Sequence, residues 1–472
     1  MIELTPVLNS KSQTPLYVQL YEYIKKEIKV GNISSGTKLP SKRKLASYLK
    51  LGQNTVEAAY HQLVAEGYIE SVSRAGFFVC NVQQNVLYSE QDTIEHITKP
   101  DMKPEKVYQF DFNHIGVDVH HFPYAVYRKL INEIVQPENA PFLLIGHAQG
   151  ELSLRTEIAR YLYQSRGVRC SPEQILLGSG TQYLLTLLCQ LVANKEFAME
   201  DPGYHRVRVI LERNGVSLTP IPLDENGIAV SHLEQSSADV VYVTPSHQFP
   251  CGMVMPISRR MQLLRWAAQK EGRYIIEDDY DSEFRYTGKP IPSLQGLDTE
   301  GKVIYISTFS KALMPSLRVS YMVLPMPLLE RYRQSHALYT QTVSRLDQEI
   351  LRKFMVNGYW DKHVNKMRIL YRKKRDTLVS SLLRFFPENT EIIGQDSGLH
   401  ILLRVNNGMS EEELLSSAAQ KGIKVYPASI YYADQKSQRS SPMIVLGFAT
   451  LTEEEIKAAI PLLYEAYFST ST

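Results

Sequence analysis

A lysine and an arginine seven residues apart stand out in the segment TFSKALMPSLR, residues 308–318. Lys311 follows an apolar, strand-like run, KVIYIST, and a short turn. A lysine amine is a nucleophile only when it is deprotonated, which a partly desolvated site beside other cations favours. Arg318 could supply such a cation and also neutralise a phosphate. A lone lysine is usually a surface residue, so Lys311 is a candidate for forming a Schiff base only together with the elements that follow.

An acid and a phenol end another apolar run, RYIIEDDYDSEF, residues 273–284. Asp278 and Tyr280 are two residues apart, so on a strand they project from the same face. A carboxylate there can pair with a protonated pyridine nitrogen, and a phenol can hydrogen-bond a ring oxygen. Taken singly, the acids of this run could equally be solvated or bind magnesium.

A predicted phosphate site lies in ILLGSGTQYLLTLL, residues 175–188, which reads as a strand, a turn of small residues and a helix. The amides around Ser179, Gly180 and Thr181 would open onto the helix N-terminus, where the dipole and free N–H donors attract anions. Tyr204, after the Pro-Gly turn of DPGYHRV, could stack on a flat ring, and Ser310 lies in the turn before the lysine.

A large α/β domain is needed to bring these residues together. From about residue 108, β-rich runs such as DVVYVTP alternate with helical ones such as SRRMQLLRWAAQ, which predicts a largely parallel sheet with helices on it. A smaller lobe is expected from about residue 366 to residue 472. Residues 83–107 are polar, contain two prolines and show no period, so their composition predicts a linker.

The pattern of residues 14–82 is different, with three short helical segments followed by a hairpin. PLYVQLYEYIKKEIKVG, SKRKLASYLKL and QNTVEAAYHQLVAEG predict the helices, and YIESVSRAGFFVC predicts two strands around a turn. This is the order of a winged helix-turn-helix, whose third helix enters the DNA major groove. A small protein-interaction domain is the alternative. The residues expected at the DNA are Ser41, Arg43, Gln53, Asn54, Thr55, Arg74 and Gly76.

The composition limits the class of protein. A chain of 472 residues predicts two or three domains, and four cysteines without CxxC spacing indicate neither a disulfide framework nor a zinc site. Without a signal-peptide pattern or a membrane-length apolar run, a cytoplasmic protein with no membrane contact is expected. Residues 1–82 contain ten Lys/Arg and six Asp/Glu, a charge of +4 that leaves −2 elsewhere. This small excess favours nucleic acid no more than an ordinary solvated domain.

The segment LPSKRKLASYLKLGQNTVEAAYHQLVAEGYIESVSRAGFFV carries a resemblance to the GntR family of bacterial repressors, over residues 14–82. Two positions depart from that family, because relatives often have arginine at Gln53 and Glu57. Fewer cations there should weaken the grip on DNA phosphates or change the sequence that is read.

The motifs TPSHQFPCG, YIIEDDYDSEF and TFSKALMPSLRVSYMVLP make residues 108–468 similar to fold-type I aminotransferases that use pyridoxal 5'-phosphate (PLP). With the N-terminal domain, the chain resembles the MocR-type transcriptional regulators. The resemblance implies a homodimer that binds double-stranded operator DNA and PLP. It further implies that Lys311 forms the Schiff base, Asp278 meets the pyridine nitrogen, Tyr280 meets the ring oxygen, Tyr204 stacks on the ring, and Ser179, Gly180, Thr181 and Arg318 hold the phosphate.

Several positions differ from a working aminotransferase. Phe249 replaces an asparagine that contacts the ring oxygen, and Val445 replaces the arginine that clamps the substrate carboxylate. Ile430 stands about where amine-responsive relatives place another arginine, and Ser316 replaces a glycine. Arg206, beside the stacking tyrosine, remains a candidate for holding a ligand carboxylate.

These observations favour a PLP-dependent regulator whose effector is PLP itself or a small amine or amino acid that displaces Lys311. The alternative is an active aminotransferase with an accessory DNA-binding domain, which the loss of the carboxylate clamp at Val445 disfavours. A third hypothesis treats the large domain as an inactive scaffold that only pairs the DNA-binding domains. Intact Lys311, Asp278 and Tyr280 disfavour it.

Overall fold

The computed structural model describes residues 4–9, 12, 14–73, 75–81, 107–287, 291–335, 339–434 and 442–468. The chain divides into two compact units, Met1–Glu105 and Lys106–Thr472, called the head and the body below.

The head is a winged helix-turn-helix, as predicted. Its elements are α1 (Leu16–Lys29), α2 (Lys42–Leu49), α3 (Gln53–Ala65), β1 (Ile69–Val72) and β2 (Gly76–Val79). The two strands pair antiparallel, and an isolated antiparallel bridge joins Lys38 to Phe78 of β2. Leu20 of α1 and Leu63 of α3 are completely buried between these helices, so the apolar stripes read from the sequence form the core of the head.

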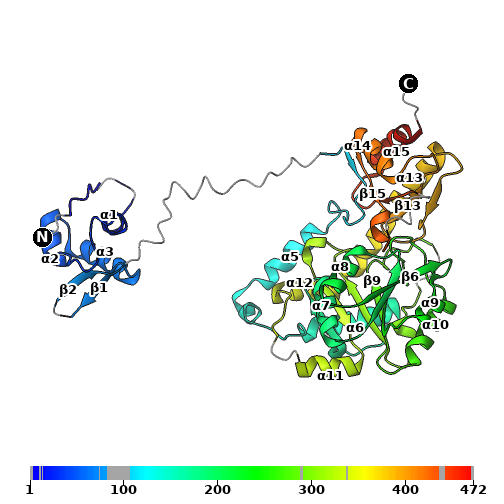
Figure 1. The fold of residues 1–472 in the computed structure, drawn as a ribbon, viewed down its shortest axis with the longest axis horizontal. Coiled ribbons are helices and arrows are strands. Elements are labelled where there is room, and N and C mark those ends of the chain that lie inside the picture. Colours follow the sequence, from blue (N-terminus) through cyan, green and yellow to red (C-terminus); the bar gives the residue numbers. More distant parts are fainter. Residues whose placement is uncertain are drawn as a thin grey trace. The chain divides into compact units, whose positions relative to one another are not determined.

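An eight-stranded sheet forms the centre of the body (Figure 1), in the order β4-β11-β10-β9-β8-β5-β6-β7. Strands β5, β6, β8, β9 and β10 are parallel neighbours, whereas β11 runs antiparallel to both β4 and β10. The bounds are β4 (Ile175–Gly178), β5 (Phe197–Asp201), β6 (Leu218–Asp224), β7 (Gly227–Ile228), β8 (Val240–Val243), β9 (Tyr274–Asp279), β10 (Val303–Thr308) and β11 (Ser320–Val323).

Helices cover both faces of this sheet. One face packs on α7 (Thr181–Leu191), α8 (His205–Arg213) and α11 (Met326–Ser335). The other face packs on α9 (Val230–Gln235) and α10 (Ile257–Ala268) towards one edge, and on α6 (Leu152–Arg166), α12 (Arg345–Val356) and α13 (Tyr359–Phe385) towards the other. Such two-sided cover explains why the strands read as continuous apolar runs.

A smaller lobe follows the long helix α13. It contains a four-stranded sheet, β12-β13-β16-β15, and a two-stranded one, β14-β3. The strands are β3 (Phe110–Asp111), β12 (Glu391–Ile393), β13 (His400–Arg404), β14 (Ile423–Lys424), β15 (Tyr426–Pro427) and β16 (Met443–Gly447), with helices α14 (Glu411–Gln420) and α15 (Glu453–Phe468). Because β3 pairs with β14, the start of the body is part of this lobe.

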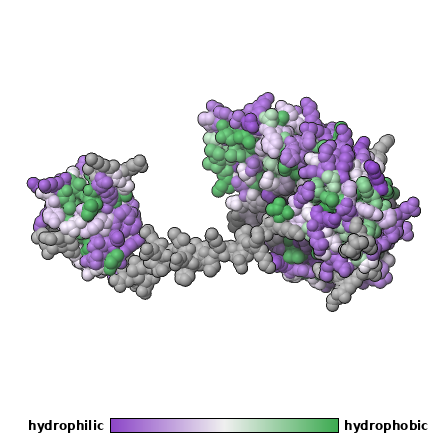
Figure 2. Space-filling model, turned by 90° about the horizontal axis from the view of Figure 1, so that it is seen from above, coloured by the Kyte–Doolittle hydropathy of each residue, from purple (hydrophilic) through white to green (hydrophobic). Residues whose placement is uncertain are grey.

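The surface of the body carries apolar side chains near the end of the short helix η2 (Pro137–Leu143), which follows α5 (Tyr124–Ile134). Leu143, Leu144 and Ile145 are 72%, 68% and 75% exposed. Figure 2 shows apolar side chains gathered on one face of the body amid a mostly hydrophilic surface. Among the described helices, none is both long enough and apolar enough to cross a bilayer.

Candidate functional site

A cavity of about 370 Å³ lies in the body where the parallel strands β8, β9 and β10 end and α7 begins. The carboxyl edge of a parallel sheet is where α/β proteins bind ligands. The sequence-predicted residues that line this cavity are Thr181, Tyr204, Arg206, Asp278, Tyr280, Ser310, Lys311 and Arg318. Ser179 and Gly180 lie beside it but do not form its wall.

Lys311 lies at the centre of this site, and its Nζ donates to two main-chain carbonyls. They belong to His114 at 2.9 Å and Ile115 at 3.1 Å. Burial lowers the pKa of Lys311 to about 8; the carboxylate of Asp281 opposes this shift and the guanidinium of Arg206 adds to it. A fraction of the amine is therefore neutral near physiological pH and able to attack a carbonyl carbon.

Asp278 faces the cavity because the strand alternates, which separates it from its two acidic neighbours. The hydroxyl of Tyr242, on neighbouring β8, donates to its carboxylate. Burial raises the pKa of Asp278 to about 7, and Tyr242 offsets this only in part. A buried carboxylate with so little positive charge around it fits a ligand that brings its own cation, such as a protonated pyridine.

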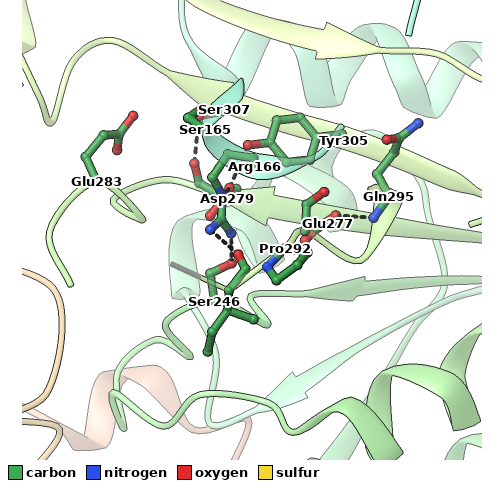
Figure 3. Close-up of polar contacts among 12 residues, drawn as sticks. Ser165, Arg166, Ser246, Glu277, Asp279, Glu283, Pro292, Gln295, Tyr305 and Ser307 are labelled. Atoms are coloured by element: carbon green, nitrogen blue, oxygen red, sulfur yellow. Dashed lines mark hydrogen bonds and ion pairs between the residues drawn. The ribbon is translucent and has the colours of Figure 1, made fainter. Parts of the chain in front are cut away.

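Asp279 points to the opposite face of β9 and anchors the strand there (Figure 3). Its carboxylate accepts from Arg166 Nε at 2.8 Å and from the hydroxyl of Tyr305 at 2.6 Å. Burial alone would raise the pKa of Asp279, but the ion pair with Arg166 holds it below its ordinary value. Arg166 also donates to Ser246 Oγ. This network fixes the end of β9, and with it the position of Asp278.

The phenol of Tyr280 lines the cavity, but its hydroxyl already has partners. It donates to the carbonyl of His247 at 3.0 Å and lies 2.9 Å from His247 Nδ1. The same Nδ1 lies 2.9 Å from a carboxylate oxygen of Asp281. The predicted contact of Tyr280 with a ring oxygen therefore stays a prediction, and a Tyr280–His247–Asp281 chain is the observed arrangement.

The predicted phosphate end is formed by the start of α7 and by Arg318. Gly180 has φ +104°, and a Cβ at this position would lie 2.1 Å from Arg318 Nη2, so only glycine lets the guanidinium come this close. The buried Oγ of Ser310 has no hydrogen-bond partner among the described residues. A free helix N-terminus, an arginine and an unpaired hydroxyl form a cradle that fits a phosphate group.

Ser179 contributes less than expected to this cradle, because its amide donates to Thr342 Oγ1 at 3.1 Å. Ser316 is exposed in the short helix η5 (Pro315–Leu317) and does not line the cavity. The phosphate role predicted for Ser179 stays a prediction.

The side of the cavity away from α7 is aromatic. The ring of Phe249 lies 5.2 Å from that of Tyr204 and 4.8 Å from that of Tyr431. The hydroxyl of Tyr431 lies 2.9 Å from His114 Nε2. Burial lowers the pKa of His114 to about 3, so this imidazole is neutral.

Val445 lies behind this aromatic wall. It is fully buried on β16 and belongs to the apolar cluster of Phe249 and Tyr431, which Ile430 also contacts. Arg206 is exposed at the cavity. Among the described lining residues, therefore, no buried arginine takes the place of the clamp.

The head presents the start of α3 to solvent. Gln53 and Asn54 are exposed, Thr55 is half-buried, and Arg43 is exposed on α2. Ser41 caps α2 by accepting from the amide of Lys44 at 3.3 Å. The remaining predicted DNA residues lie in the wing: Gly76 has φ +115°, and Arg74 lies outside the described residues.

Several residues of the site were missed from sequence. His247 lies within the TPSHQFPCG motif and could have been singled out there, whereas His114, Tyr242 and Tyr431 have no local signal.

Fold and site together define a class of protein: a winged helix-turn-helix joined to an aminotransferase-type body. Comparison with known families agrees, because residues 16–79 match the bacterial regulatory proteins of the gntR family, and residues 106–462 match aminotransferase class I and II.

Known relatives align with this chain over nearly their whole length. The chain is 46% identical to "Uncharacterized HTH-type transcriptional regulator YdeL" of Bacillus subtilis, over 99% of this chain and 100% of that one. It is 29% identical to "Probable rhizopine catabolism regulatory protein MocR" of Rhizobium meliloti, over 98% and 96%. The chain therefore belongs to the HTH-type transcriptional regulators that join a gntR-family domain to an aminotransferase class I and II domain, and the resemblance to MocR-type regulators is confirmed.

Solved structures similar to this chain are aminotransferases. The Pyrococcus horikoshii kynurenine aminotransferase is 25% identical with a TM-score of 0.68, over 78% of this chain and 92% of that one. The multiple substrate aminotransferase of Thermococcus profundus is 24% identical with a TM-score of 0.69, over the same shares. The fold-type I prediction for the body is thus confirmed.

Proposed function

We propose that this regulator binds operator DNA through α3 and the wing, and holds PLP in the Lys311 cavity. The main supporting observation is that Lys311, Asp278 and the cradle at Arg318 share one cavity. Burial lowers the pKa of Lys311, and the carboxyl of Asp278 has no described cation beside it. PLP, when bound, supplies an aldehyde for a primary amine and an electron-withdrawing ring. Asp278 would hold the ring nitrogen, Tyr204 the ring face and Arg318 the phosphate.

The effector is proposed to be PLP itself or a small primary amine that competes with Lys311 for it. Either ligand regulates only if it binds two states of the protein with different affinity. The aromatic wall around Phe249 favours an apolar ligand body, and Arg206 is the cation available to a ligand carboxylate. The relative named "HTH-type pyridoxine biosynthesis transcriptional regulator PdxR" of Corynebacterium glutamicum, 28% identical over 99% of both chains, supports PLP as a signal.

A homodimer is part of the proposal. Three consecutive large apolar side chains, Leu143 to Ile145, are exposed in the body, and such surface is typical of protein contacts. Two heads would then read repeated or inverted half-sites. Leu144→Lys should convert a dimer into a monomer in light scattering.

The test of cofactor binding is an absorption titration of the full-length protein with PLP. Wild type should develop a visible band that Lys311→Ala abolishes, and a wild type that stays unchanged would overturn the proposal. A transaminase assay with amino and keto acids separates the alternative, because turnover at about 1 s⁻¹ or faster would indicate an enzyme.

The inactive-scaffold alternative needs its own test, a DNA footprint of wild type and Lys311→Ala with and without PLP. If PLP is the effector, PLP should change the footprint of wild type only, and if an amine is the effector, the amine should change the footprint of PLP-loaded wild type only. If PLP binds but neither PLP nor an added amine changes the DNA affinity, the body is a scaffold.

A further inference from the structure

A second cavity, of about 410 Å³, lies in the body and shares none of its lining residues with the Lys311 cavity. It is enclosed by the C-terminal end of α6, the loops that follow β8 and β9, and the N-terminal half of α13. Figure 3 shows part of its wall, where Arg166 meets Ser246. Glu283, labelled in the same view, also lines the cavity. Its size is that of a pocket for a small metabolite.

Arginines dominate the charge of this cavity. The charge of Arg166 is balanced by its ion pair with Asp279. Three further arginines line the wall and form no ion pair among the described residues: Arg285, Arg368 and Arg372. Arg368 donates through Nε to the carbonyl of Glu283 and through Nη1 to Asn365. In the described part of the chain, these three guanidinium groups therefore lie at the wall without a carboxylate in direct contact.

Two acids line the same cavity and must be weighed against these cations. The carboxyl of Glu283 accepts from the hydroxyl of Tyr161 at 3.1 Å, and burial raises its pKa to about 7. A large part of its negative charge is thus absent near neutral pH. Asp361 is exposed at the start of α13, and Arg372 is exposed too, so solvent screens both of these charges, whereas Arg285 and Arg368 are half-buried. The balance at the wall is positive.

Three polar atoms of the lining are buried and have no hydrogen-bond partner among the described residues. They are Arg285 Nε, His247 Nε2 and Ser397 Oγ, and the residues His247 and Ser397 are only 2% and 5% exposed. A buried polar atom without a partner costs about 1–3 kcal/mol, so such groups usually face a ligand or water. Arg285 Nε and Ser397 Oγ are hydrogen-bond donors, and their place in the lining of one cationic cavity favours a ligand that accepts hydrogen bonds. His247 Nε2 is an acceptor, because Nδ1 of the same ring donates to Asp281.

We propose that this cavity, called the arginine cavity, binds the oxyanion group of a small organic acid, a carboxylate or a phosphate. Arg285 and Arg372 supply the charge, and the hydroxyl of Ser397 donates to the ligand. Guanidinium groups suit both oxyanions because their planar N–H donors bind two oxygens at once. His247 also bonds Asp281, which lines the Lys311 cavity, so the arginine cavity adjoins the proposed cofactor site through one side chain.

The test is calorimetric titration of the full-length protein with citrate and, separately, with inorganic phosphate, at constant ionic strength set by chloride. Saturable binding of either probe is expected, and the probe that binds identifies the class of oxyanion. R372Q and R285Q should each weaken it by about tenfold or more, the effect of losing one charge-assisted contact. R384Q, on the exposed surface of the same helix α13 and outside the cavity, should bind as wild type does.

R318Q separates the two cavities, because Arg318 lines the Lys311 cavity and not the arginine cavity. The cradle at Arg318 also fits phosphate, so only the binding that R318Q leaves intact is assigned to the arginine cavity, and the proposal requires that such binding persist. It is overturned if neither probe binds, if R372Q and R285Q bind as tightly as R384Q, or if R318Q is the variant that loses the ligand. None of these outcomes depends on whether PLP binds at Lys311.

Discussion

The rate at which the protein captures PLP should follow the protonation of Lys311. With a pKa of about 8, roughly one amine in ten is neutral at pH 7, against roughly one in three thousand for an ordinary lysine with a pKa near 10.5. Protonation alone therefore makes this amine about 300 times more reactive at pH 7 than an exposed lysine. The rate should rise about tenfold per pH unit below pH 8 and level off above it.

Stopped-flow absorption of the full-length protein mixed with PLP from pH 6 to 10 measures this rate. N-acetyl-lysine amide, treated identically at each pH, corrects for the titration of PLP itself. Arg206→Gln removes a cation near the amine and should move the plateau to a slightly higher pH, by little because Arg206 is exposed. A corrected rate that keeps rising to pH 10 would refute the reasoning, since it would mean an ordinary lysine pKa.

The same shift has a consequence for stability. The folded-state pKa of Lys311 lies below the unfolded value, so between pH 8 and 10.5 the unfolded chain binds more protons and stability rises with pH. Below pH 8 the buried ammonium costs the apo protein about 3 kcal/mol as an upper limit. Lys311→Met should remove this term, so that its unfolding free energy exceeds that of wild type at pH 7 and the difference shrinks towards pH 10. Denaturant unfolding of the apo proteins at both pH values measures it.

Three further predictions concern the phosphate cradle, the DNA-binding residue Arg43 and the buried residue Val445. Gly180→Ala should weaken PLP binding by about tenfold or more, because the new methyl group would occupy the space of the Arg318 guanidinium. The control is Gly215→Ala, which also has a positive φ, +75°, but no atom within 4 Å of its Cβ. This variant should leave the absorption titration unchanged. Arg43→Ala should weaken binding to the operator and reduce the slope of log K against log salt concentration by about one. Lys26→Ala on α1 is the control. An unchanged slope would show that Arg43 does not contact the DNA. Val445→Arg should destabilise the body by several kcal/mol in denaturant unfolding, because its surroundings are apolar; wild-type stability would contradict that account.

Local patterns in the sequence predicted those parts of the site that a strand or a turn positions. Alternation along β9 was enough to assign Asp278 to the cavity, and the structure places Asp279 on the opposite face. The small residues before α7 likewise predicted a helix N-terminus open to an anion, and no described side chain caps α7. These inferences need only the periods of regular structure, which the sequence contains.

Residues that reach the site from distant segments could not be predicted. The carbonyl of His114 accepts from Lys311 across 197 positions of sequence, and Tyr431 meets His114 across 317. The amide of Ser179 is engaged by Thr342, 163 residues away. Such contacts depend on how segments far apart in the sequence pack together, and no periodicity of a single segment contains that information.

The position of Val445 bears on why a body of aminotransferase fold would serve as a sensor. An aminotransferase must hold its substrate in one orientation while protons move, and a buried bidentate arginine provides that orientation. Here Val445, which the resemblance places at that position, is fully buried in the apolar cluster of Phe249, and the arginines that line the cavity, Arg206 and Arg318, are exposed. An exposed ion pair contributes only about 0–1 kcal/mol, too little to fix an orientation. A sensor needs only a difference in occupancy between two states, which Lys311 and Asp278 can supply without that clamp.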